Sequence, residues 1–320
     1  MRQIRMVGLA ALVVFVVSAV GVGTASAEKA PKYTANTYAQ YKYCPYDHEE
    51  RRGWCYTGIT SGGSKGGFFQ FGKVKVPLNK PITLHGGYNE RGNIEPVETE
   101  EEEEQIIVFP ATHGGQTLEA PELKVTGGIS LLNKTVQMNQ GWPAALVESW
   151  KEAKKNHEGN VYAKIELAGN ELFEVPDGLS TTNLVLEKGT AFRLPLKVKI
   201  TSPWLEKLGS GPCYIGTDAH PVHINLTSGG AGSAGTEELA ADHNSIILRN
   251  SRLVDLGWTI EPESAPTGCG GMYESYIDNS LSQILEIGPN KTGIVVLQGT
   301  LYTGDKQPIF EKGIENGELP

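Results

Sequence analysis

The segment from Asp218 to His223 holds one carboxylate and two imidazoles, which are the groups used for metal ligation and for general acid–base chemistry. A proline follows His220, so the segment is expected to turn and then enter a strand rather than form a helix. Three residues apart on a strand, His220 and His223 would point to opposite faces, which suits shared ligation poorly. A glycine-, serine- and alanine-rich loop separates this segment from Asp242 and His243. The sequence favours ordinary surface histidines, and it leaves as an alternative a hydrolase site built from Asp218, His220, His223, Asp242 and His243.

Two short strings match motifs of known enzymes. Gly62–Gly66 reads G-x-S-x-G, but a hydrolase needs its serine on a sharp turn between a buried strand and a helix. Here the segment before the string is not a hydrophobic strand and the segment after it reads as a strand, so a glycine-rich loop is expected. Lys291–Gly293 reads K-T-G, yet the only S-x-x-K string, Ser26 to Lys29, spans the site after Ala27 where a secretory leader, described below, is expected to be cleaved. Lys291 is expected in a turn before a strand.

Aromatic residues crowd the beginning of the exported part of the chain, around Cys44 and Cys55. Rings with polar tips suit recognition of sugars, peptides or lipid head groups. The alternative is that they pack over a disulfide and cover the edge of a sheet. The residues singled out as tentative ligand contacts are Tyr41, Tyr43, Tyr46, Trp54 and Tyr56.

The chain has four cysteines, Cys44, Cys55, Cys213 and Cys269, and an even number in an oxidising compartment indicates two disulfides. Of the three pairings, Cys44–Cys55 with Cys213–Cys269 is favoured, because each bridge then stays within one half of the chain. A zinc site is disfavoured, since no C-x-x-C pair is present. No P-loop, dinucleotide fingerprint or H-E-x-x-H string occurs either, so no cofactor or metal is expected.

Apolar and polar residues alternate in several segments, as in half-buried strands of antiparallel sheets. The clearest are Val74–Leu78, Val161–Leu167, Arg193–Thr201 and Val222–Leu226. Three continuous apolar runs predict strands buried on both faces: Ile106–Phe109, Ile246–Leu248 and Ile294–Leu297. Glycine doublets at irregular spacing predict turns between the strands.

Helical spacing appears in two places. Pro143 suits a first helical position and is followed by Leu146, Val147, Trp150 and Ala153, with Gly159 as the expected end. A shorter helix is expected over Ser275–Ile287, with one apolar face formed by Ile277, Leu281, Ile284 and Leu285. The tail after Gly304 is polar and is expected to fray.

The sequence thus predicts a mainly β fold: an antiparallel sandwich or barrel with a helical insertion near residues 143–158 and a short helix near 275–287. The organisation expected is a leader over residues 1–27 and a β-rich exported region over 28–320. That region divides into one β domain or two subdomains, 28–140 and 160–303, joined by a helix.

The first 27 residues have the pattern of a secretory signal peptide. Arg2 and Arg5 precede an apolar run of about 16 residues, and Ala25-Ser26-Ala27 is a small-residue cleavage site. The run is shorter than the ~20 residues of a membrane-spanning helix, so no membrane span is expected after cleavage. The leader has no acidic residue, so its removal would change the net charge from −9 to −11. Such acidity excludes nucleic acid as an expected partner. The acidic run Glu98–Glu104 is expected to be a solvated loop.

Several segments of the chain resemble a family of secreted actinobacterial proteins of uncharacterised function. The segments are Cys213–Thr227, Thr267–Gly271, Tyr43–Pro45, Lys80–Gly87, Asn160–Gly169 and Val296–Leu301. The resemblance covers most of the chain after the leader and implies export and a bacterial source. It implies no activity, ligand or catalytic residue, and the run Glu98–Glu104 departs from the family's usual pattern.

The function expected from these observations is that of a secreted or cell-envelope-associated, non-catalytic binding or structural protein. Its ligand is unknown, and a cell-wall polymer or a lipid would suit it. Two alternatives remain: the hydrolase described above, and a carrier of apolar ligands with a β-barrel cavity.

Overall fold

A computed structural model of the chain describes residues 38–45, 53–91, 105–112, 114–169, 181–239, 245–287 and 291–319. These residues belong to one compact unit, Ala35–Pro320. The predicted leader, the run Glu98–Glu104 and Tyr46 lie outside the described residues. No helix in the described part of the chain combines the length and the apolar character that crossing a membrane requires.

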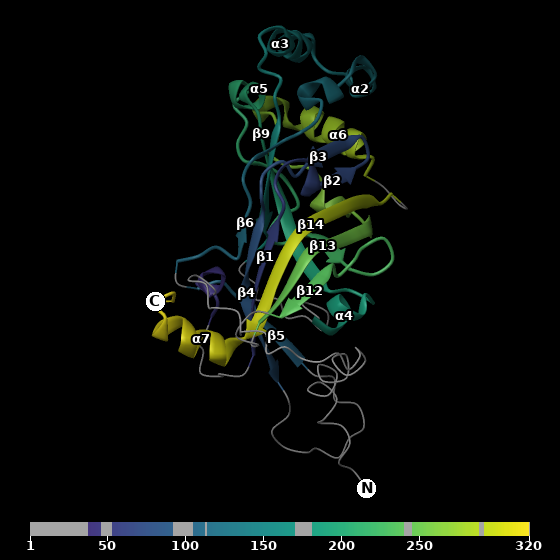
Figure 1. The fold of residues 1–320 in the computed structure, drawn as a ribbon. Helices are drawn as coiled ribbons and strands as arrows, with labels where there is room; N and C mark the ends of the chain where they lie inside the picture. Colours follow the sequence, from purple (N-terminus) through teal and green to yellow (C-terminus); the bar gives the residue numbers. More distant parts are fainter. Residues whose placement is uncertain are drawn as a thin grey trace. The chain divides into compact units, whose positions relative to one another are not determined.

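Nine of the described strands form the larger sheet, and all of its pairings are antiparallel. Its main path runs β12-β13-β14-β1-β4-β5, so strands from both ends of the chain lie side by side in it (Figure 1). Strands from both 28–140 and 160–303 therefore share this sheet. The strands are β1 Trp54–Thr60, β2 Gly67–Phe71, β3 Val74–Pro77, β4 Thr83–Arg91, β5 Gln105–Pro110, β6 Leu118–Glu119, β12 Thr236–Leu239, β13 Ser245–Trp258 and β14 Gly293–Asp305.

A second antiparallel sheet packs its apolar face against the first. It consists of β7 Leu123–Lys124, β8 Tyr162–Leu167, β9 Phe192–Thr201, β10 Cys213–Ile215 and β11 Val222–Leu226. Residues of both sheets, among them Tyr56, Leu194 and Leu301, form one buried cluster between them. The mainly β prediction is confirmed, and of the two architectures expected the structure has the sandwich.

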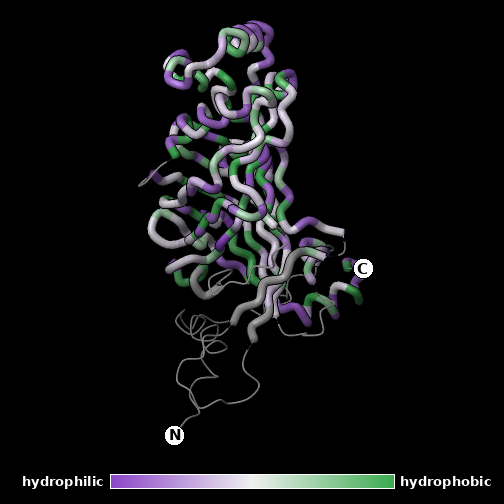
Figure 2. Tube along the Cα trace, turned by 180° about the vertical axis from the view of Figure 1, so that it is seen from behind, coloured by the Kyte–Doolittle hydropathy of each residue, from purple (hydrophilic) through white to green (hydrophobic). Residues whose placement is uncertain are grey.

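Alternation along the strands decides which side chains enter this core. On β11, Val222, Ile224 and Leu226 are buried whereas His223 and Asn225 are exposed. Hydrophobic and hydrophilic residues accordingly alternate along the strands in Figure 2. The three continuous apolar runs are strands, as predicted, but burial on both faces is wrong for Ile294, the first residue of one run, which is 37 % exposed. A run of apolar residues does not by itself reveal which faces of a strand are covered.

The helices are α2 Lys134–Asn139, α3 Ala144–Lys155, α4 Thr181–Leu186, α5 Pro203–Lys207, α6 Glu274–Leu285 and α7 Lys306–Glu315. The two predicted helices correspond to α3 and α6. Helix α3 ends at Lys155, before the predicted Gly159. His157, two residues after the helix, adopts a left-handed backbone conformation with φ 60°. Helices α2, α3, α5 and α6 gather at one end of the sheets, whereas α7 lies at the other (Figure 1).

The tail after Gly304 is a helix, contrary to the prediction that it frays. The Asp305 carboxylate caps α7 by accepting a hydrogen bond from the backbone N–H of Gln307 at 3.1 Å. Ile309 of α7 is fully buried against Tyr38, Tyr41 and the Cys44–Cys55 disulfide. Polar composition suggested fraying, and a tertiary contact with the other end of the chain overrides it.

Candidate ligand-binding cavity

An apolar cavity of about 120 Å³ lies at the helical end of the sandwich. Folded proteins contain few voids larger than a water molecule, so a volume of this size is unusual in a packed core. Its lining is almost entirely hydrophobic, and none of the described lining residues carries a charge. We call it cavity 1. An apolar cavity of comparable size, about 150 Å³, binds benzene or xenon in another protein.

The two sheets provide the side walls of cavity 1. Phe69 and Phe71 of β2 and Val74 and Val76 of β3 form the wall from the larger sheet. Inward residues of β8, β9 and β11 form the opposite wall: Ala163, Ile165, Leu196, Val198, Ile200, Val222 and Ile224. Alternation with period two brings this second set to one face, so the sequence already indicated that these side chains point inward.

Helical segments close the end of cavity 1. Helix α6 contributes Ile277, Leu281, Ile284 and Leu285, the apolar face that its sequence predicts. Trp204 of α5 and Trp258 at the end of β13 also line it. The indole N–H of Trp204 donates to the Ser149 hydroxyl at 3.1 Å, which satisfies its polar edge outside the apolar space. The tryptophans of the cavity come from separate segments, and no sequence spacing signalled their meeting.

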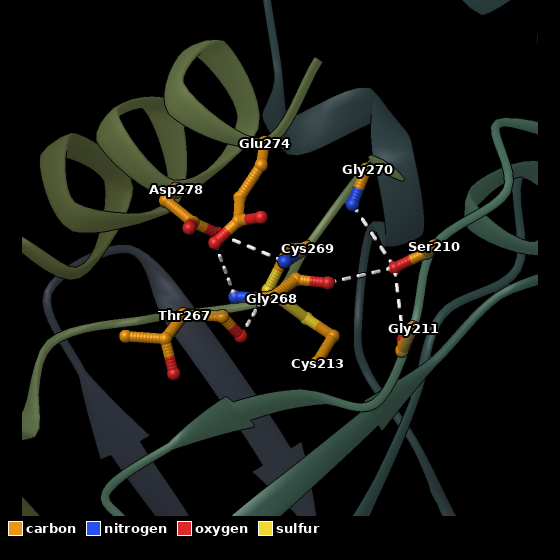
Figure 3. The surroundings of a disulfide bond; sticks show 9 residues. All are labelled: Ser210, Gly211, Cys213, Thr267, Gly268, Cys269, Gly270, Glu274 and Asp278. Atoms are coloured by element: carbon orange, nitrogen blue, oxygen red, sulfur yellow. Dashed lines mark hydrogen bonds between the residues drawn. A yellow bond between two sulfur atoms is a disulfide. The ribbon is translucent and has the colours of Figure 1, made fainter. Parts of the chain in front are cut away.

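Helix α6 is fastened at its start by the loop that carries Cys269 (Figure 3). The Glu274 carboxylate accepts a hydrogen bond from the Gly268 N–H at 3.2 Å, and the Asp278 carboxylate accepts one from the Cys269 N–H at 3.1 Å. The Ser210 hydroxyl donates to the Gly268 carbonyl and accepts from the Gly270 N–H, both at 3.0 Å. The wall of cavity 1 formed by α6 is therefore held in place from the outside.

Burial raises the pKa of the Asp278 carboxyl to about 7. The hydrogen bond from the Cys269 N–H opposes the rise, and the negative charge of Glu274 adds to it. This carboxyl therefore titrates near neutral pH, on the helix that closes cavity 1.

Both disulfides join the cysteines in the favoured pairing, Cys44 to Cys55 and Cys213 to Cys269. The second one ties β10 to the loop before α6. A pair of backbone hydrogen bonds between Tyr214 and Thr267 continues the same connection. No free cysteine occurs among the residues described.

The predicted aromatic contacts are distributed between interior and surface. Tyr41 is buried in the cluster that contains Ile309, and Tyr56 is buried between the sheets, where desolvation raises the pKa of its phenol. Tyr43 and Trp54 are half-buried. Tyr43 packs edge-on against His85, with ring centroids 5.0 Å apart. A ligand role for these rings stays a prediction.

Of the residues proposed for a hydrolase, Asp218 is engaged in other contacts. The Asp218 carboxylate accepts hydrogen bonds from Lys197 Nζ and from the Gly169 N–H, both at 2.7 Å, and these hold its pKa below the usual range. His223 lies on the exposed face of β11, where partial burial and the Arg193 charge lower its pKa. No hydrogen bond joins Asp218, His220 and His223 within the described part of the chain. Asp242 and His243 lie outside it.

The two enzyme-like strings lie in turns. Gly63–Lys65 is a single 3-10 turn between β1 and β2, and Lys291 precedes β14 and pairs with Glu286 at 3.7 Å. In the ranges that the structure describes, no three histidine, cysteine, aspartate or glutamate side chains gather in an arrangement that could hold a metal ion.

Comparison of the chain with protein-family models, with curated proteins and with solved structures found no match.

Proposed function

We propose that this chain is an extracellular, non-catalytic binding protein that holds an apolar ligand in cavity 1. The observation that carries the proposal is an apolar volume of about 120 Å³ inside the sandwich. At about 24 cal/mol per Å³, a cavity of this size costs roughly 3 kcal/mol of stability compared with a filled core. That is a large fraction of the 5–15 kcal/mol by which proteins are stable, so retaining the cavity suggests a use for it.

The chemistry of the lining supports a hydrocarbon as the bound group. Because the walls are aliphatic and aromatic and carry no charge, an ionised ligand would lose its hydration without compensation. A hydrocarbon instead gains about 25 cal/mol for each Å² of apolar surface that it removes from water. Of the expected partners, a lipid therefore suits the cavity better than a cell-wall polymer.

Export and the extracellular location belong to the same proposal. The leader pattern of residues 1–27 predicts secretion, and two disulfides suit an oxidising compartment. The resemblance to secreted actinobacterial proteins is in keeping with this location.

Tryptophan fluorescence can test the proposal, since Trp204 and Trp258 line cavity 1. Bromine quenches tryptophan on contact, so titration with 1-bromohexane should give saturable quenching. Ala163→Leu adds carbon atoms to the wall of the cavity and should weaken this binding at least tenfold. Lys164→Leu places a leucine on the opposite face of the same strand, which points away from cavity 1, and should leave the binding unchanged. Unsaturable quenching of the unmodified protein, or equal binding by Ala163→Leu, would contradict the proposal.

A further inference from the structure

A second apolar cavity, of about 80 Å³, lies between the same two sheets. We call it cavity 2. It lies where β14 changes its partner in the larger sheet. Residues 294–297 of β14 pair with β2, and residues 299–305 pair with β1. Cavity 2 therefore lies beside the place where β1 and β2 separate from each other along β14.

Cavities 1 and 2 follow one another along the same strands. On β9, cavity 1 is lined by Leu196, Val198 and Ile200, and cavity 2 is lined by Phe192 and Leu194. Strand β11 repeats this order, with Ile224 at cavity 1 and Leu226 at cavity 2. At ~3.3 Å per residue, the span from Phe192 to Ile200 is roughly 26 Å. Leu194, which lines cavity 2, and Leu196, which lines cavity 1, are successive inward residues of β9, so no other inward residue of this strand lies between the two cavities.

Cavity 2 contains a buried hydroxyl. Ser251 lines the cavity and is 5 % exposed, and its Oγ has no hydrogen-bond partner among the residues that the structure describes. A β-bulge precedes it, because the register of β13 on β14 shifts between Leu248 and Ser251. Asn250, within the bulge, has a left-handed backbone with φ 57°. Bulges re-aim side chains, and this one places Ser251 opposite Gly299 in the lining of the cavity.

The other groups of cavity 2 limit what Ser251 could bind. The hydroxyl of Thr60 already accepts a hydrogen bond from the Ile82 N–H at 2.8 Å. No described residue of the lining is charged, so an ionised carboxylate or phosphate would be buried without a counter-charge. A neutral hydroxyl or an ester carbonyl could instead form a hydrogen bond with Ser251 Oγ.

We infer that the two cavities form one elongated site for a linear aliphatic molecule with a neutral polar end group, and that Ser251 binds this end group. The inference rests on the proposed function and deepens it by naming the ligand class: long-chain alcohols and esters. The aliphatic chain extends along β9 and β11 into cavity 1, and the end group lies in cavity 2.

Equilibrium dialysis with tritiated cetyl alcohol, methyl palmitate and hexadecane tests this assignment. The alcohol and the ester should bind the unmodified protein more tightly than the alkane. Ser251→Ala should weaken alcohol and ester binding by about threefold to tenfold, the usual contribution of one net hydrogen bond, and leave hexadecane unchanged. Palmitate at pH 8 should bind more weakly than the alcohol.

Gly58→Val supplies a second, steric test. Within 4 Å, a Cβ at Gly58 would meet only Leu301 Cδ1, at 3.5 Å, and both residues line cavity 2, so a side chain added here is expected to fill part of that cavity. This variant should lose cetyl alcohol binding and keep 1-bromohexane quenching in cavity 1. The smaller Gly58→Ala should have a weaker effect in the same direction.

The outcomes separate the two proposals. Equal effects of Ser251→Ala on alcohol, ester and alkane, or palmitate binding as tight as that of the alcohol, would overturn the role of Ser251 and leave the carrier function standing. Cetyl alcohol binding that survives Gly58→Val would overturn the elongated site. Absence of binding for every ligand, 1-bromohexane included, would overturn both the site and the function.

Discussion

The surroundings of Asp278 and Asp218 shift the pKa values of the two carboxyl groups in opposite directions. Asp278 is partly buried in the first half of α6, and desolvation raises its pKa to about 7. Asp218 is exposed and paired with Lys197, which lowers its pKa. Folding therefore favours the protonated form of Asp278 and the ionised form of Asp218. Their effects on stability against pH therefore have opposite signs.

Asp278→Asn should change the pH dependence of stability. Ionised Asp278 opposes folding, so its contribution lowers the free energy of unfolding as pH rises from about 4 to about 7. The asparagine removes this loss and keeps an oxygen that can accept from the Cys269 N–H. Urea denaturation should show the variant about 1–2 kcal/mol more stable at pH 8, a value reduced for solvent screening, and equal near pH 4.

Asp218→Asn is the control for this measurement. The pKa of Asp218 is lower in the folded state than in the unfolded state, so ionised Asp218 stabilises the fold at pH values above its unfolded-state pKa. This contribution is lost as the pH falls through its folded-state pKa. This variant should be slightly less stable at neutral pH and equal to the unmodified protein in strong acid. A gain in stability at pH 8 from both substitutions alike would contradict the assignment to Asp278.

Helix α6 lines cavity 1 on one side and is hydrogen-bonded on the other to the loop that carries Cys269. The Cys213–Cys269 bridge spans 56 residues, whereas Cys44–Cys55 spans 11. Because the entropy lost by the unfolded chain grows with loop length, the longer bridge should contribute more to stability.

Replacing each pair of cysteines by alanine tests this order. The loop-entropy relation predicts a loss of about 4 kcal/mol for Cys213 and Cys269 and about 3 kcal/mol for Cys44 and Cys55. Only the first pair should also weaken 1-bromohexane binding, since it fastens the helix that closes cavity 1. Chemical denaturation and fluorescence titration of both variants measure the two effects. Equal binding by the two variants would show that the bridge does not hold the cavity wall.

Across the part of the chain that the structure describes, the buried hydrophobic residues form three clusters. One lies between the sheets, one includes the helices at the end with cavity 1, and a small one packs residues 38–45 against α7. The third cluster joins the two ends of the described chain and includes neither of the cavities. Stability and ligand binding should therefore be separable by mutation.

Ile309→Ala tests this separation. Ile309 is fully buried, and removal of a buried isoleucine side chain costs about 2–5 kcal/mol. We expect a loss of about 3 kcal/mol in urea denaturation and unchanged 1-bromohexane binding under conditions where the variant is folded. Ile314→Ala, on the same helix but 45 % exposed, should change stability by no more than about 0.5 kcal/mol. Loss of binding in Ile309→Ala would show that the third cluster supports the cavity.

Local patterns of the sequence predicted strands at the positions of β2, β3, β5, β8, β9, β11, β13 and β14, the two main helices and the apolar face of α6, but not β1 and β4 in the middle of the larger sheet. Alternation in Arg193–Thr201 and Val222–Leu226 reports which side of a strand is apolar, and helical spacing does the same for Ile277 and Ile284. The disulfide pairing also followed from positions in the chain alone. Helix α7 was missed because its buried face depends on residues from the opposite end of the chain.

The cavities, the raised pKa of Asp278 and the Ser251 hydroxyl, which has no hydrogen-bond partner among the described residues, depend on the tertiary structure alone. Each depends on how side chains from distant segments meet, and in the case of the cavities on how incompletely they fill the space between the sheets. The period of apolar residues in a sequence indicates on which side of its own helix or strand a side chain lies. It contains no information on the volume left between that side chain and its partners across the core.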